Sequence, residues 1–262
     1  MKQNDILNKK EILEKLNNKN AEIILLESID STNKYLKQIS CESTEWTTVI
    51  AENQTSGRGR YDRTFFSPEN CGIYMSVLLK PKISADSAVL ITAAAAVAVS
   101  DAIEKLSSKQ TQIKWVNDIL IGTKKVCGIL CEGVLNTQSG CIDSVILGIG
   151  INVYTPENDF DDSIKNIAGA IFNEKIPDMR NLLIAEIINS FEKYYNELEN
   201  RTFLEIYRSR SAVVGKNVTV LKGEEKIPAK AVSIDDNCRL EVEFKNLNRE
   251  FLSSGEISIK LN

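Results

Sequence analysis

The chain has 262 residues, of which 43% are hydrophobic and 26% charged, and a formal net charge of −4 at pH 7. These values exclude a wholly disordered chain, allow a sizeable core in one or two domains, and show no excess of the basic charge that is typical of dedicated nucleic-acid binders. The absence of histidine excludes Ser-His-Asp and Cys-His nucleophilic catalysis and every metal site that needs an imidazole.

Hydrophobic periodicity predicts an α+β domain over residues 1–212. Helices are predicted at residues 6–17, from Ser31 or Thr32 to about 38, at 86–106, at 180–200 and over TFLEIYRSR. Strands are predicted at residues 22–29, 47–54 and 71–80, and over QIKW, DILIG, VCGILCEGVL and CIDSVILGIGINVY.

The pattern changes after about Val213, where short alternating segments follow one another without helical spacing. Strands at intervals of roughly 8–12 residues are typical of small all-β barrels. The sequence therefore predicts a second domain, a small β-barrel, over residues 213–262.

The six cysteines form no CxxC pair and do not have the spacing of a disulfide framework. Cys127 and Cys131 lie in an apolar run, which favours buried free thiols over metal ligands. The N-terminus has no apolar signal core, and the apolar run at Ala93–Val99 is much shorter than the roughly 20 residues that span a membrane. We therefore expect a cytoplasmic protein without membrane association.

Three arginines and two glycines gather in the loop Gly57–Arg63. Glycine lets backbone amides approach an anion, and arginine pairs with carboxylate or phosphate through two parallel hydrogen bonds. The loop therefore indicates an anion site, although a solvated surface turn fits the same residues. It is not a dinucleotide-binding fingerprint, because Asp62 stands where that motif needs glycine.

Two further clusters follow. The run Lys114–Asp118 and Lys125 bring together a pair of cations, an amide and a carboxylate, which can meet a phosphate, a ribose or a metal, or can form the polar tips of a hairpin. Gly148 and Gly150 alternate with isoleucine before Asn152, so one face of the predicted strand has no side chains there. Such a face allows a flat ligand to approach closely, but a bulge or tight sheet packing fits the same pattern.

The order of STN, ENQTSGRGR, KWVND, KKVCGIL, GIGIN and a terminal GEIS resembles the biotin–protein ligases (biotin–[acetyl-CoA-carboxylase] ligases), over about residues 22–260. The resemblance implies a class II synthetase-like catalytic fold, with a mixed central sheet flanked by helices and an SH3-like C-terminal barrel. It also implies an enzyme that joins biotin and ATP to form biotinyl-5′-AMP, with Mg²⁺ accompanying ATP. The biotinyl group then passes to one lysine of a biotin carboxyl carrier protein.

Residue roles follow from the same resemblance. The implied catalytic residues are Lys125, Arg60 and Asp118. The implied biotin-binding residues are Ser31, Thr32, Asn33, Gln54, Gly57, Arg58, Gly59, Arg60, Lys125, Gly128, Gly148 and Gly150. The implied ATP-binding residues are Arg58, Arg60, Arg63, Lys114, Trp115, Asn117, Asp118, Asn152 and Lys260. The metal ligands stay unknown.

The chain departs from the family pattern at Asp62, Val116 and Lys260, where the family has glycine, proline and, in some members, arginine. Only about 20 residues precede the first predicted strand, too few for the winged-helix DNA-binding domain of some members. We therefore expect a ligase without a nucleic-acid partner. A homodimer is left open, and the alternatives are a lipoate–protein ligase and a non-catalytic biotin-sensing or carrier-binding module.

Overall fold

The computed structural model describes residues 5–81, 88–135, 142–222, 225–253 and 256–259; Lys260 lies outside them. The helices are α1 (Lys9–Lys15), α2 (Thr32–Ile39), α3 (Ala88–Ser107), α4 (Met179–Asn196) and α5 (Leu204–Ser209), with a 3₁₀ turn at Arg60–Asp62. The first seven strands are β1 (Glu22–Ile29), β2 (Thr47–Gln54), β3 (Gly72–Leu79), β4 (Gln112–Lys114), β5 (Asp118–Ile121), β6 (Lys124–Leu135) and β7 (Ile142–Asn152). The last five are β8 (Asn217–Lys222), β9 (Glu225–Ile234), β10 (Leu240–Phe244), β11 (Arg249–Leu252) and β12 (Glu256–Ile259).

The first seven strands form one mixed sheet in the order β1-β2-β3-β7-β6-β5-β4. β1 and β2 are parallel, and the other neighbouring strands are antiparallel. β7 lies in the middle, with β3 along one edge and β6 along the other. This arrangement confirms the predicted α+β fold with a mixed central sheet.

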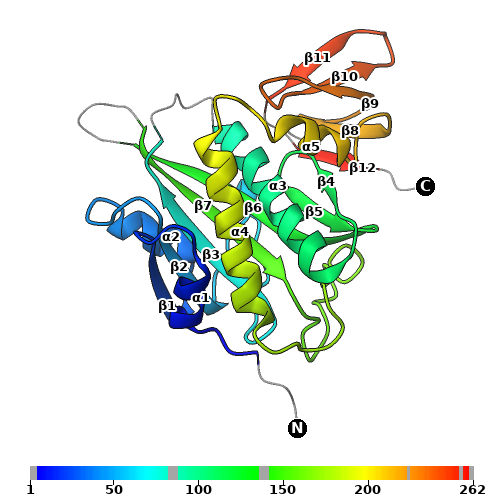
Figure 1. The fold of residues 1–262 in the computed structure, drawn as a ribbon. Helices are drawn as coiled ribbons and strands as arrows, with labels where there is room; N and C mark the ends of the chain where they lie inside the picture. The colour runs from blue at the N-terminus through cyan, green and yellow to red at the C-terminus, as the bar shows by residue number, and fades with distance from the viewer. Residues whose placement is uncertain (1–4, 82–87, 136–141, 223–224, 254–255, 260–262) are drawn as a thin grey trace.

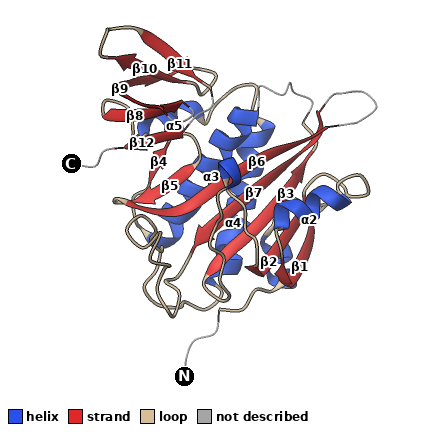
Figure 2. Ribbon diagram, turned by 180° about the vertical axis from the view of Figure 1, so that it is seen from behind, coloured by secondary structure: helices blue, strands red, loops and turns tan. Residues whose placement is uncertain are grey.

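The two faces of this sheet are covered differently. Helices α3 and α4 lie across one face, and α2 lies on the opposite face beside β2 and β3 (Figures 1 and 2). On the α2 side, Leu36 packs against Val49, Leu78 and Ile146 in a small separate core. Because α2 is short, it leaves the part of this face over β7, β6 and β5 for the site described below.

The last five strands form a separate antiparallel sheet in the order β11-β10-β9-β8-β12, beyond the β4 and β5 end of the main sheet (Figure 1). This agrees with the predicted all-β C-terminal unit. The boundary between residues 212 and 213 stays a prediction.

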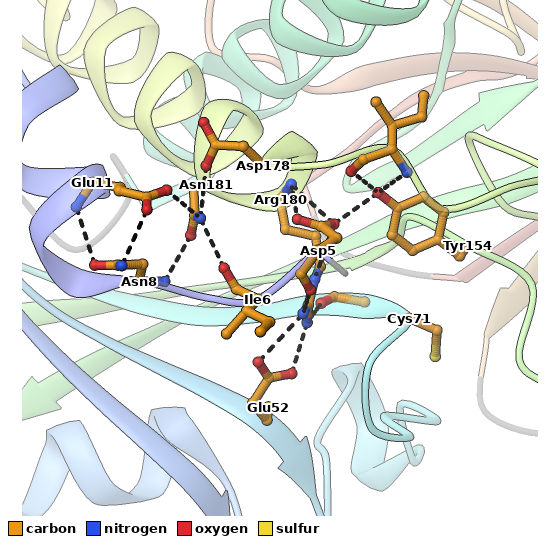
Figure 3. Close-up of polar contacts among 12 residues, drawn as sticks. Asp5, Ile6, Asn8, Glu11, Glu52, Cys71, Tyr154, Asp178, Arg180 and Asn181 are labelled. Atoms are coloured by element: carbon orange, nitrogen blue, oxygen red, sulfur yellow. Dashed lines mark hydrogen bonds and ion pairs between the residues drawn. The ribbon is translucent and has the colours of Figure 1, made fainter. Parts of the chain in front are cut away.

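A fully buried arginine ties the N-terminal segment to the main sheet (Figure 3). Arg180, in the first turn of α4, forms ion pairs with Asp5 (Nε to Oδ2, 3.3 Å) and with Glu52 of β2 (Nη1 to Oε2, 2.7 Å). Tyr154 donates its hydroxyl to the same Asp5 carboxylate at 2.7 Å. Asp5 is also completely buried, so the pair is shielded from water on all sides.

The described cysteines are free thiols, as predicted, and Cys71, Cys127 and Cys238 are buried, whereas Cys131, which was expected to be buried with Cys127, is half-buried. Burial raises the pKa of the Cys238 thiol to about 12, so this thiol stays protonated at physiological pH. Cys141 lies outside the described residues. Among the helices that the structure describes, none is long and apolar enough to cross a membrane.

Candidate active site

A cavity of about 750 Å³ opens on the α2 face of the main sheet. Its walls come from the start of α2, the loop between β2 and β3 (residues 55–71, called the arginine loop below), the β4–β5 turn and the segment between β7 and α4. Such a volume suits an organic ligand of the size of a nucleotide conjugate.

Strand register builds the floor of this cavity. Residues paired across neighbouring strands form one row: Ala51, Tyr74, Gly150, Gly128, Asp118 and Lys114. Because directly paired residues point to the same face of a sheet, the two glycines lie between an aromatic residue and two charged residues. The floor therefore has no side chains at its centre, and its charged side chains, those of Asp118 and Lys114, lie at one end.

The glycines of β7 are required by close neighbours rather than by backbone angles. A Cβ at Gly148 would lie 2.2 Å from Asn33 Oδ1, and a Cβ at Gly150 would lie 2.6 Å from a ring carbon of Phe65. Any larger residue would displace the start of α2 or the aromatic side chain of the loop. The strand face without side chains that the sequence predicts is present, and Asn33 and Phe65 approach the backbone of β7 there.

The end of the cavity near β1 and β2 is lined by polar, uncharged side chains. Ser31 caps α2 by accepting from Lys34 N, which places Thr32 and Asn33 in the first turn of the helix. Thr32 donates to Gln54 Oε1 from its backbone amide (2.9 Å) and its hydroxyl (3.1 Å). Ser31, Thr32 and Asn33 are all buried. These groups offer hydrogen bonds to a neutral ligand.

The opposite end carries cations. Lys125 Nζ lies 2.6 Å from Asp118 Oδ1, and Arg60 Nη1 donates to Asn117 Oδ1 at 3.3 Å. The hydrogen bond between Arg60 and Asn117 connects the arginine loop to the β4–β5 turn. Arg58 lies nearer the polar end: its Nη1 is 3.2 Å from Glu132 Oε1, and the other oxygen of that carboxylate accepts from Asn33 Nδ2 at 2.8 Å. Each of the three cations is held by a polar partner that an anionic ligand can replace.

The structure brings together nearly all the residues predicted from the sequence. Those that line the cavity are Ser31, Thr32, Asn33, Gln54, Arg58, Gly59, Arg60, Arg63, Lys114, Trp115, Asn117, Asp118, Lys125, Gly128, Gly148, Gly150 and Asn152. Gly57 does not line it; a Cβ there would lie 2.4 Å from the carbonyl oxygen of Phe65, so this glycine serves packing inside the loop. Lys260 lies outside the described residues.

Two groups of lining residues were missed by sequence reasoning. The first is aromatic: Tyr61, Phe65, Phe66 and Tyr74. The second is a wall from the β7–α4 segment: Asp161, Ser163, Ile164, Ile167 and Ala168. Backbone hydrogen bonds from Lys125 N to Ile167 O (2.7 Å) and from Gly169 N to Lys125 O (2.9 Å) hold this wall beside β6.

The fold and the cavity define an α+β protein that can hold a neutral ring system and an anionic group side by side. Two family profiles match the chain: the Biotin/lipoate A/B protein ligase family over residues 25–152, and the Biotin protein ligase C terminal domain over residues 213–260. The chain is 38% identical to the bifunctional ligase/repressor BirA of Bacillus subtilis over 221 residues, which cover 82% of this chain and 67% of that protein. It is 29% identical to the biotin–[acetyl-CoA-carboxylase] ligase of Mycobacterium tuberculosis over 73% of this chain and 71% of that protein.

A solved structure of similar fold is the biotin protein ligase of Aquifex aeolicus in complex with biotin and ATP. It has a TM-score of 0.76 and 27% identity, and the match covers 92% of this chain and 99% of that one. The chain belongs to the biotin protein ligase family.

Proposed function

We propose that this cavity carries out both steps of biotin–protein ligation: formation of biotinyl-5′-AMP from biotin and ATP, and transfer of the biotinyl group to a lysine of a carrier protein. One observation carries the proposal. A polar pocket and three cations share a single cavity over a glycine-lined floor, with Lys125 and Arg60 at one end and Arg58 beside the pocket. This is the arrangement needed to bring the carboxylate of an uncharged ring compound against a triphosphate.

In the first step the biotin rings occupy the end formed by Ser31, Thr32, Asn33 and Gln54, whose groups offer hydrogen bonds to a ureido ring. The biotin carboxylate lies toward Lys125 and the arginine loop. Its oxygen attacks the α-phosphorus of ATP, and the bond to pyrophosphate breaks. Arg58, Arg60 and Lys125 offset the repulsion between the two anions, which is the main physical barrier to their approach.

The nucleotide lies at the other end, against Arg63, Lys114, Trp115, Asn117, Asp118 and Asn152. In the described part of the chain no cluster of three or more carboxylate or thiol ligands could hold a metal ion. Mg²⁺, if it accompanies ATP, would be held mainly by the phosphate oxygens and water and would offset the charge of the triphosphate.

In the second step the amine of the acceptor lysine attacks the biotinyl carbonyl carbon, the bond from that carbon to the phosphate oxygen breaks, and AMP leaves. Asp118 accepts the proton that the amine loses. Its carboxylate borders the cavity and already faces an ammonium group, that of Lys125.

Asp118→Asn is expected to slow transfer to the carrier by about 10²-fold or more, the usual contribution of a general base. The asparagine oxygen still accepts from Lys125, so adenylate formation should change little. Single-turnover measurement of each step, with preformed biotinyl-5′-AMP for the second, separates the two rates. Equal slowing of both steps would remove this role from Asp118.

Gly148→Ala is expected to raise the KM for biotin about tenfold, because a methyl group forced into a filled space costs about 1–3 kcal/mol and displaces Asn33. The KM for ATP, which binds at the other end, serves as the internal control. A parallel rise in both constants would instead indicate a general distortion of β7.

The acceptor is a lysine on a biotin carboxyl carrier domain of acetyl-CoA carboxylase or a related carboxylase. The free thiols of the described cysteines fit the reducing cytoplasm. A homodimer stays open; because β7 is paired along both edges, a second copy could not extend the main sheet by adding a strand at β7.

The decisive experiment is ATP–pyrophosphate exchange with the purified protein and Mg²⁺, with biotin or lipoate added separately. Exchange with biotin alone, followed by turnover on a carrier, is the expected result. Exchange with lipoate alone would reassign the substrate, and binding of biotin without exchange would identify a sensor.

A further inference from the structure

The β4–β5 turn faces the cavity on one side and the C-terminal sheet on the other. Trp115, in this turn, lines the cavity yet is only 4% exposed. Its indole Nε1 donates to the carbonyl oxygen of Cys238 at 2.8 Å, in a buried hydrogen bond that spans 123 residues. Cys238 lies between β9 and β10, so the C-terminal sheet contacts the wall of the site directly.

Hydrogen bonds from α5 and from the residues that follow it also hold β4 and the β4–β5 turn. Tyr207 of α5 donates its hydroxyl to Val116 O at 3.1 Å. Burial raises the pKa of Tyr207 well above its ordinary value, so the hydroxyl stays protonated and remains a donor. Ile113 N donates to Arg210 O (2.8 Å), and Ala212 N donates to Ile113 O (2.9 Å).

The Cys238 carbonyl group, which accepts the hydrogen bond from the indole, is itself held in place by its turn. In the β9–β10 turn (residues 235–239), Cys238 N donates to Asp235 O, and Asp235 N donates to Arg239 O, each at 3.0 Å. Cys238 has a φ of +58°, a conformation that non-glycine residues keep only when their surroundings impose it. Arg208 of α5 donates to Ile234 O at 2.9 Å and lies 2.6 Å from Asp236 Oδ1, which anchors the turn to α5.

We propose that the β9–β10 turn of the C-terminal sheet positions the nucleotide side of the active site through the indole of Trp115. The inference rests on the proposed function. Trp115 is a positioning residue in this respect: its hydrogen bond fixes the turn that joins Lys114 of β4 to Asn117 and Asp118, adding to the strand pairing that holds these residues beside the cavity. Groups in a catalytic cavity must be held to within about 0.5 Å, and loosely supported ones lose rate or affinity.

A double-mutant cycle tests this coupling. Trp115→Phe keeps the ring and removes the donor, whereas Arg208→Met releases the turn without touching a residue that lines the cavity. The KM values for ATP and biotin are measured in biotin-dependent ATP–pyrophosphate exchange. Each variant is expected to raise the KM for ATP about fivefold, the loss of one hydrogen bond, with the KM for biotin within about twofold.

The double variant is expected to be no worse than either single variant, because both break the same connection. Multiplication of the two effects, or an equal rise in both KM values, would overturn the proposal. Arg249→Met serves as the matched control, since the exposed Arg249 lies in the same sheet and its ion pairs within the described residues are with the half-buried Glu241 and Glu243, away from the β9–β10 turn.

A second measurement does not depend on activity. The chain has two tryptophans, so Trp46→Phe leaves Trp115 as the sole indole fluorophore. Adding Arg208→Met to this variant is expected to shift the emission to longer wavelength and increase quenching by acrylamide. An unchanged spectrum would overturn the coupling, whereas absence of exchange in the unmodified protein would contradict only the proposed function.

Discussion

Lys125→Met is expected to lower the rate of biotin adenylation by about 10²–10³-fold, the usual effect of removing one preorganised donor to a developing charge. Lys125 is the cation nearest the glycine floor: a Cβ at Gly128 would lie 3.0 Å from its Nζ. Methionine keeps the length of the side chain and removes the charge, so the cavity keeps its shape. The carboxylate of Asp118 then loses its partner at 2.6 Å and adds to the repulsion of the incoming anions.

Single-turnover formation of biotinyl-5′-AMP measures this loss. Lys105→Met is the matched control, because Lys105 pairs with Glu186 on the face of the sheet that α3 and α4 cover. A Lys125→Met protein that forms the adenylate at the normal rate would show that the arginine loop alone offsets the charge.

Arg180→Met has the largest expected effect on stability, a loss of about 3–5 kcal/mol in the free energy of unfolding. The substitution leaves Asp5 buried without a counter-charge and Glu52 only partly exposed to water. Removing one partner of a buried pair costs more than the pair contributes, because the remaining charge keeps its full desolvation penalty.

Urea unfolding followed by circular dichroism measures the change. Asp5→Asn in the same variant is expected to restore part of the loss, since the amide needs no counter-charge and still accepts from Tyr154. Arg249→Met, where the arginine is exposed to water, should cost at most about 1 kcal/mol. A loss of that size for Arg180→Met would mean that water reaches the pair.

Local signals in the sequence accounted for the floor and the charges of the site. The short apolar run EIILL and the β-branched run TTVI placed β1 and β2 at the residues observed, because short runs of this kind favour buried strands. Gly148 and Gly150 signalled close approach, since glycine in a strand leaves space that something must fill. The arginines of the loop signalled an anion by their chemistry alone.

The wall at residues 161–168 could not be predicted in the same way. Its place depends on backbone hydrogen bonds between Lys125 and residues 167 and 169, about 40 positions later, and backbone groups leave no mark in side-chain patterns. Gly57 shows the reverse case: a motif glycine, expected to touch ligand, serves the fold of its own loop. The buried Arg180 was also unforeseen, because its two carboxylate partners come from distant segments.

The floor of the cavity, formed by β7, and its wall, formed by the arginine loop, are expected to differ in the free energy of local unfolding. The backbone of β7 is paired on both sides, with β3 and β6, so its amides exchange with solvent only when the whole sheet unfolds. The arginine loop is held mainly by bonds within itself, such as Gly59 N to Arg63 O, and by side chains, so it opens locally. We therefore expect ligand binding to slow hydrogen exchange in the arginine loop and to leave that of β7 almost unchanged, so that the substrates order the loop over a rigid floor.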